Sequence, residues 1–195
     1  MTVEIRPCAG AAIAPYLADI ARLRMEVFRD YPYLYEGTLA YEEAYLRAYA
    51  AADDHLVVLA LGDGKVIGAS TAMPLVAHGD EVVPPFVGVG IDPASVFYFG
   101  ESVLAAPFRG RGLGHAFFAE RERFGRTHGF ALAAFCAVER PPNHPLRPPA
   151  YAPLDPFWQR RGYVRRADLR TAFTWQDVGE PAPSAKPMVF WTKAL

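Results

Sequence analysis

The stretch that decides the fold is residues 96–127, VFYFGESVLAAPFRGRGLGHAFFAERERFGRT. Its first nine residues, 96–104, are rich in aromatic and β-branched side chains and predict a β-strand. Residues 112–127 carry apolar side chains at helical spacing and predict an amphipathic helix. Residues 130–138, FALAAFCAV, predict another strand. A strand, a helix and a strand in this order form a βαβ unit, which requires the two strands to be parallel.

Outward from this unit, the sequence predicts an α/β fold with a mixed sheet flanked by helices. Gly62-Asp63-Gly64 is a turn signal between two β-rich runs and predicts an antiparallel hairpin. The other strands are expected at 2–6, 55–61, 65–74, 169–175 and 188–193, and the other helices at 13–30, 39–51 and 157–161.

Two proline-rich segments are expected to lack regular structure. Residues 75–94 contain three prolines and three glycines in an apolar setting, which predicts an ordered surface loop that covers something. Residues 141–156 contain seven of the 18 prolines, which predicts an extended excursion shaping an acceptor site.

The two helices near the start of the chain are expected to cover the core. In 13–30, the apolar residues at helical spacing form one face and four charged residues form the other. The apolar set is Leu17, Ile20, Leu23, Val27 and Phe28, and the charged set is Arg22, Arg24, Glu26 and Arg29. Tyr41, Tyr45 and Tyr49 form a stripe on the next helix, which is typical of packing residues.

Composition limits the function classes. With 20 Lys and Arg against 21 Asp and Glu, the net charge is −1, so no nucleic-acid partner is predicted. No uncharged stretch reaches the ~18 residues of a membrane span, and Glu4 and Arg6 interrupt any signal peptide. A cytoplasmic protein with no membrane partner is therefore expected.

Cys8 and Cys136 are expected to be reduced thiols, with no metal site. The 195 residues, 52% apolar, predict one domain, 1–195.

Arg109-Gly110-Arg111-Gly112-Leu113-Gly114 is the strongest chemical signal. Glycines between a strand and a helix let a ligand approach the backbone, and the first helical turn offers unpaired N–H groups that suit phosphate oxygens. A P-loop is disfavoured because no lysine lies between Lys65 and Lys186. A dinucleotide-binding fold is the stronger rival, with Glu139 as its ribose-binding acid, but His115 replaces the third glycine and no further βα repeats follow.

The sequence resembles the GNAT superfamily of acyl-CoA-dependent N-acyltransferases. Arg109, Gly112 and Gly114 match the family signature Gln/Arg-x-x-Gly-x-Gly/Ala, and Phe157 to Tyr163 looks like its Phe-Tyr-x-x-x-Gly-Phe element. The order of elements agrees over nearly the whole chain. The resemblance implies a sheet that splays open beside the glycine loop, pantetheine in the cleft, and the pyrophosphate of acetyl-CoA on residues 109–115. It also implies that a backbone N–H around Leu104 binds the thioester carbonyl.

The expected activity is direct transfer of an acetyl group from CoA to an amine in a ternary complex, with no metal. The acceptor is a small-molecule or peptide amine, and a homodimer is left open. A non-catalytic acyl-CoA sensor on the same fold is the alternative, since fold alone does not fix function.

Glu101 is the expected base for the acceptor's proton, because a carboxylate in an apolar strand calls for an explanation. Asp30, Glu36 and Glu139 are weaker alternatives. Gly100 beside it fits a β-bulge.

Trp158 stands where family members often carry an acidic tyrosine, and an indole N–H cannot give up its proton. The alternative acids are Tyr98, Tyr151 and Cys136. The acceptor is expected to enter beside loop 75–94 and three tyrosines that could hold a cation. These are Tyr31, Tyr33 and Tyr35.

Overall fold

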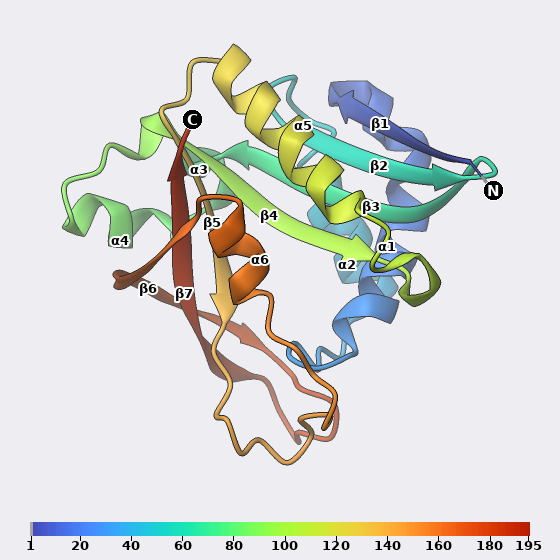
Figure 1. The fold of residues 1–195 in the computed structure, drawn as a ribbon, viewed down its shortest axis with the longest axis vertical. Helices are drawn as coiled ribbons and strands as arrows, with labels where there is room; N and C mark the ends of the chain where they lie inside the picture. The colour runs from blue at the N-terminus through green and yellow to red at the C-terminus, as the bar shows by residue number, and fades with distance from the viewer. Residues whose placement is uncertain (1) are drawn as a thin grey trace.

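In the computed structural model, which describes residues 2–195, seven strands form one sheet in the order β1-β2-β3-β4-β5-β7-β6 (Figure 1). Only β4 and β5 pair in parallel, and the other neighbours are antiparallel. The predicted α/β fold, hairpin and βαβ unit are therefore confirmed. The strands are β1 (Val3–Ala9), β2 (Leu56–Gly62), β3 (Lys65–Pro74), β4 (Val96–Leu104), β5 (Leu132–Val138), β6 (Val164–Trp175) and β7 (Ser184–Ala194).

Helices cover both faces of the sheet. Figure 1 shows α5 crossing one face, while α1 and α2 lie behind the other. The α-helices are α1 (Leu17–Phe28), α2 (Leu39–Arg47), α3 (Leu75–His78), α4 (Val83–Gly88), α5 (Leu113–Thr127) and α6 (Asp155–Arg160). Three 3₁₀ segments are η1 (Gly10–Tyr16), η2 (Pro93–Ser95) and η3 (Ala106–Phe108).

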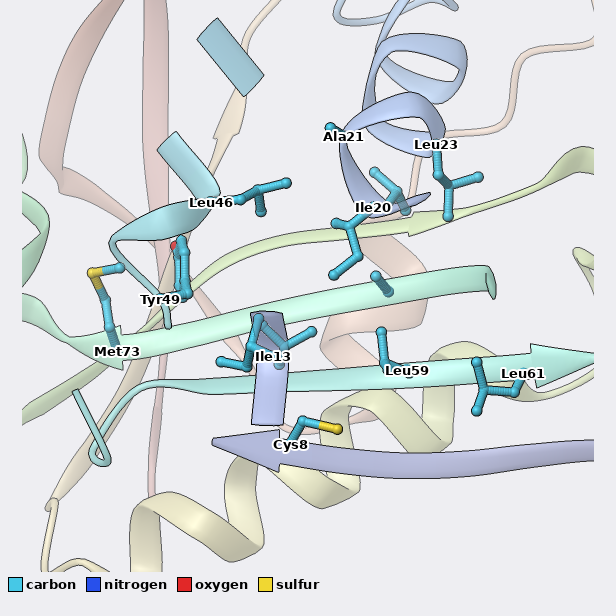
Figure 2. Packing of buried hydrophobic residues seen from close by; sticks show 13 residues of the cluster. Cys8, Ile13, Ile20, Ala21, Leu23, Leu46, Tyr49, Leu59, Leu61 and Met73 are labelled. Atoms are coloured by element: carbon cyan, nitrogen blue, oxygen red, sulfur yellow. The ribbon is translucent and has the colours of Figure 1, made fainter. Parts of the chain in front are cut away.

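Successive side chains of a strand point to opposite faces of the sheet, so apolar cores form on both faces. On β4, Phe97 and Phe99 pack with Phe117 and Phe118 of α5. Tyr98 faces the other side of the sheet. On that side, α1 and α2 bury a cluster against β2 and β3 (Figure 2). Its labelled members are Cys8, Ile13, Ile20, Ala21, Leu23, Leu46, Tyr49, Leu59, Leu61 and Met73.

The expectation of an irregular loop over 75–94 is wrong, because the segment contains α3 and α4. Pro84 lies in the first turn of α4, where a missing N–H removes no helical hydrogen bond. Gly79, at φ 119°, ends α3. Both helices bury apolar side chains, Leu75 and Phe86, against the sheet.

The predicted helix 13–30 divides in two, with a 3₁₀ segment before α1. The prediction that Arg24 lies on the charged, exposed face of this helix is also wrong, because Arg24 is buried. Arg24 lies four residues after Ile20 and three before Val27, so helical spacing places it on the core-facing side.

The sheet opens between β4 and β5. These strands pair only through Val96, Phe97 and Tyr98, after which β4 keeps only β3 as a neighbour. The pairing of β3 with β4 also shifts register between Ser70 and Ala72, opposite Gly100, which confirms the predicted bulge.

Gly100→Ala is expected to destabilise the protein. A Cβ at Gly100 would lie 2.5 Å from Tyr49 Oη and 2.6 Å from Thr71 Oγ1. Overpacking of this kind costs about 1–3 kcal/mol, which corresponds to a Tm loss of roughly 2–10 °C. Gly88→Ala is the control, because its Cβ would meet open space. Thermal unfolding measures both variants, and an unchanged Tm for Gly100→Ala would contradict the close approach.

Candidate functional site

Two cavities lie on opposite faces of the opened sheet. The larger, of about 1070 Å³, is lined by the glycine loop, by Phe117 and Phe118 of α5, and by Trp158. The smaller, of about 560 Å³, is lined by α1, the α1–α2 segment and β6, with Tyr98 from β4. Phe117 and Tyr98 belong to cores on different faces of the sheet, so the two cavities approach β4 from opposite sides.

The two cavities meet at a shared wall. Five residues line both of them: Phe28, Tyr33, Gly100, Glu101 and Cys136. Gly100 and Glu101 lie on β4 just beyond its last pair with β5, and Cys136 lies on β5 just beyond the same point. The gap between the strands is therefore where molecules in the two cavities would touch.

The glycine loop presents free backbone donors at the start of α5. Gly112 is the N-cap residue at φ 83°, and Gly110 has φ 76°. The backbone N–H groups of Gly110, Arg111 and Gly112 have no hydrogen-bond acceptor within residues 2–195. The first N–H groups of α5 are also unpaired inside the helix, and its dipole is positive at this end. This arrangement suits the oxygens of a phosphate group.

The structure brings nearly all of the residues predicted from the glycine loop to the larger cavity. Arg111 is the exception, because its guanidinium carbon lies over the Phe108 ring at 5.4 Å and it does not line the cavity. The lining residues are Leu104, Arg109, Gly110, Gly112, Leu113, Gly114 and His115.

Arg109 and His115 are each held by a neighbour. Arg109 Nε donates to the Leu104 carbonyl oxygen at 3.0 Å, and its Nη2 lies 3.6 Å from Asp30. The His115 ring packs against Phe157 with centroids 4.9 Å apart. Arg109 therefore connects the end of β4 with the glycine loop.

Glu101 is buried in a network that the sequence did not reveal. Its Oε1 lies 2.5 Å from Arg24 Nη1, and its Oε2 accepts a hydrogen bond from Tyr45 Oη at 3.2 Å. Arg24 also pairs with Glu42, which is fully buried. Burial disfavours the charged guanidinium, but Glu101 is the largest influence in the opposite direction, and the pKa of Arg24 lies well above its usual value. The carboxylate at the shared wall is thus held in one position.

Arg121 approaches the same bulge from the other face. It is 1% exposed, and its guanidinium donates to the carbonyl oxygens of Thr71 at 3.3 Å and Glu101 at 3.2 Å. It also donates to Ser102 Oγ at 2.8 Å. Burial lowers the pKa of Arg121 to about 10. Sequence reasoning missed this residue, although it follows Phe117 at the spacing of the apolar face.

The alternative bases do not all line the same cavity. Asp30 and Glu139 line only the larger cavity, and Glu36 lines only the smaller. Glu139 pairs with Arg165 and Arg170. None of the three reaches the shared wall.

Of the three alternative acids, Cys136 alone lines both cavities. Tyr98 lines the smaller cavity and Tyr151 the larger. The Tyr98 hydroxyl lies 3.1 Å from Cys136 Sγ. Burial raises the pKa of Cys136 to about 12, so its thiol stays protonated at neutral pH.

The excursion 141–156 lies beside the larger cavity, through Arg147 and residues 150–155, and none of its residues lines the smaller one. Its Tyr151 packs edge-on against Tyr31, with centroids 4.7 Å apart. The tyrosines expected beside an acceptor are divided, because Tyr31 lines the larger cavity, Tyr35 the smaller, and Tyr33 both. His78 and Glu81, from the segment 75–94, line the smaller cavity.

Comparison with solved structures identifies the fold. A ribosomal-protein-alanine N-acetyltransferase from Brucella melitensis superposes with a TM-score of 0.65 at 15% identity, covering 98% of this chain and 99% of that one. A GNAT-family acetyltransferase from Streptococcus pneumoniae gives a TM-score of 0.62 at 13% identity over 100% of both chains. PaiA N-acetyltransferase from Thermoplasma acidophilum, solved with coenzyme A, gives 0.57 at 13% identity over 100% of both chains. The chain has the fold of the GNAT acetyltransferases.

No family model and no curated protein matches the sequence. In the part of the chain that the structure describes, no three His, Cys, Asp or Glu side chains gather as metal ligands would. Among the described residues, no helix has the length and apolar character needed to cross a membrane.

Proposed function

We propose that the protein transfers an acetyl group from acetyl-CoA to an amine, with donor and acceptor bound at the same time. The observation that carries this proposal is the meeting of two cavities at the shared wall. A donor in the larger cavity and an acceptor in the smaller one would approach each other through the gap between β4 and β5. Binding both reactants in contact converts a bimolecular reaction into an effectively unimolecular one.

The larger cavity supplies what a CoA thioester needs. Free N–H groups at Gly110 to Gly112 and the start of α5 would bind the pyrophosphate. Beyond Tyr98, the side of β4 that faces the gap has no strand partner, so its backbone can bind the amide groups of pantetheine as a neighbouring strand would. A backbone N–H near Leu104 is the proposed donor to the thioester carbonyl.

The reaction requires a neutral nitrogen and a proton acceptor. The nitrogen lone pair forms the new C–N bond, the C–S bond breaks, and the sulfur leaves with the bonding electron pair. We assign the nitrogen's proton to Glu101, whose carboxylate lies at the shared wall. Free thiols have a pKa near ~8.5, so CoA leaves readily as a thiolate. Trp158 then needs no acidic role, and it packs against Phe135 and Trp191.

Release of the CoA thiol in the presence of amines tests the proposal directly. Saturable acetyl-CoA binding without thiol release for any amine would instead identify a sensor. Binding of a nicotinamide dinucleotide in place of CoA would contradict the proposed donor.

Gly112→Val is expected to weaken acetyl-CoA binding by about tenfold or more, because its side chain would project beside the phosphate-binding N–H groups. Gly112 has φ 83°, so valine there also strains the backbone. Gly64→Val is the matched control, since Gly64 has φ 80° and open space around its Cβ in the β2–β3 turn. Calorimetric titration measures the Kd, and equal affinity in the two variants would exclude the loop as the phosphate site.

Glu101→Gln is expected to lower kcat/KM by roughly 10²–10⁴-fold while acetyl-CoA affinity stays nearly unchanged. The loss should shrink as the pH approaches the amine pKa of ~10.4, because more of the acceptor is then already neutral. Glu43→Gln is the control, because this carboxylate lines neither cavity.

The pH profile separates a base from a structural partner of Arg24. A loss of activity that is independent of pH and accompanied by a lower Tm would assign Glu101 to the ion pair alone. A rise confined to the acceptor KM would make Glu101 an anchor for the acceptor.

A further inference from the structure

The smaller cavity is lined by aromatic rings from three parts of the fold. Phe, Tyr and Trp make up eight of its 20 lining residues, against 13% of the whole chain. The α1–α2 side contributes Phe28 and Tyr33, with centroids 4.7 Å apart, and β6 contributes Trp175, 6.1 Å from Tyr33. Faces and edges of rings on several sides of one space suit a planar aromatic ligand.

The charged groups of this cavity favour a cation. Three carboxylates line it, from Glu36, Glu81 and Glu101, against the single guanidinium of Arg24. That guanidinium is already engaged by Glu101 and Glu42, and Glu36 pairs with the exposed Arg29 at 3.1 Å. Glu81 has no ion-pair partner among the described residues, so four carboxylates stand against two guanidinium groups and the cluster stays negative. A ligand carrying its own carboxylate would meet an excess of like charge, whereas an ammonium group would be attracted by the carboxylates and the ring faces.

His78 adds no opposing charge. Its ring packs edge-on against Tyr98, with centroids 4.6 Å apart, and is stacked with Phe173 at 6.2 Å. Burial lowers the pKa of His78, so the imidazole is neutral at pH 7 and acts as another flat wall.

An extended peptide is a poorer fit. A peptide commonly binds by adding a strand to a free sheet edge, and β6 is such an edge strand. The α1–α2 segment already occupies the end of this edge. Glu36 N donates to the Gln176 carbonyl oxygen at 2.9 Å, and Val178 N donates to that of Leu34 at 2.6 Å. The volume of about 560 Å³ is that of a small-molecule site.

We propose that the acceptor is a small arylalkylamine without a carboxylate, with its ring among Tyr33, Phe173 and Trp175 and its nitrogen at the shared wall. This inference rests on the proposed acetyl transfer. A short alkyl chain is needed because Trp175 and Phe173 lie in the smaller cavity only, whereas the nitrogen must reach Glu101 at the gap.

Matched amines test the proposal by CoA thiol release. 2-Phenylethylamine is compared with phenylalanine, which adds a carboxylate, and with hexylamine, which lacks the ring. We expect kcat/KM for 2-phenylethylamine to exceed that of hexylamine about tenfold and that of phenylalanine about 100-fold. Equal or faster transfer to spermidine, or to a peptide with a free amino terminus, would overturn the inference while leaving acetyl transfer intact.

The variant Phe173→Ala tests whether the ring of Phe173 binds the ring of the acceptor. It should lower kcat/KM for 2-phenylethylamine about tenfold, change the value for hexylamine little, and leave the acetyl-CoA Kd unchanged. Val164→Ala is the control, because Val164 lies on the same strand, is 62% exposed and lines neither cavity. An equal loss for both amines would overturn the role of the ring.

A binding measurement separates this inference from the proposed function. 2-Phenylethylamine without acetyl-CoA should change the tryptophan fluorescence saturably, and Trp175→Phe should remove the change, because Trp158 and Trp191 line only the larger cavity. Such a signal without thiol release from any amine would uphold the aromatic-amine site and overturn the transfer reaction. If neither the fluorescence change nor thiol release is observed, both the aromatic-amine site and the transfer reaction are overturned.

Discussion

The early separation of β4 from β5 is the constraint on which the site depends. After Tyr98 and Ala134 the two strands no longer pair, so backbone groups in the middle of a seven-stranded sheet face a gap. Buried backbone polar groups require partners, and a ligand laid along β4 would supply them. The chain that leaves β4 passes through η3 and the glycine loop into α5, which places the free N–H groups of the loop at the same edge. The gap and the anion site therefore arise from one βαβ unit.

Two buried arginines fix the bulge beside that gap. Arg24, from α1, pairs with the Glu101 carboxylate, while Arg121, from α5, donates to the Glu101 backbone oxygen. Desolvating these charges is costly, and such groups are weak contributors to stability compared with apolar packing. Arg24 and Arg121 lie on opposite faces of the sheet, and together they hold Glu101 in position between the two cavities. This role explains why two buried charges are present. A carboxylate with fixed geometry is what positioned proton transfer requires.

Much of the fold was predictable because it depends on local patterns. Strand 96–104 was predicted with its observed bounds, and Gly100 indicated the bulge. The glycine loop was recognisable because its function requires positive φ and free N–H groups. In contrast, prolines in 75–94 concealed α3 and α4, since proline is tolerated in the first turn of a helix.

The missed parts of the site depend on contacts between distant residues. Arg24 carries a charge that suggests an exposed position, and its partners Glu42 and Glu101 are far from it in sequence. The smaller cavity combines rings of Tyr33 and Trp175, which come together only when β6 reaches the sheet edge. Helical spacing places Arg24 on the core-facing side of α1, but no periodicity within a single segment indicates its partners or the rings that meet at the smaller cavity.

Initial-rate kinetics with both substrates varied test the central claim that donor and acceptor meet at the gap. The acetyl-CoA concentration is varied at several fixed concentrations of a productive amine, and reciprocal rates are plotted. We expect intersecting lines, because the reaction requires both molecules to be bound together. Parallel lines would show that the acetyl group first moves to the protein, with Cys136 as the only thiol at the shared wall, and would contradict direct transfer.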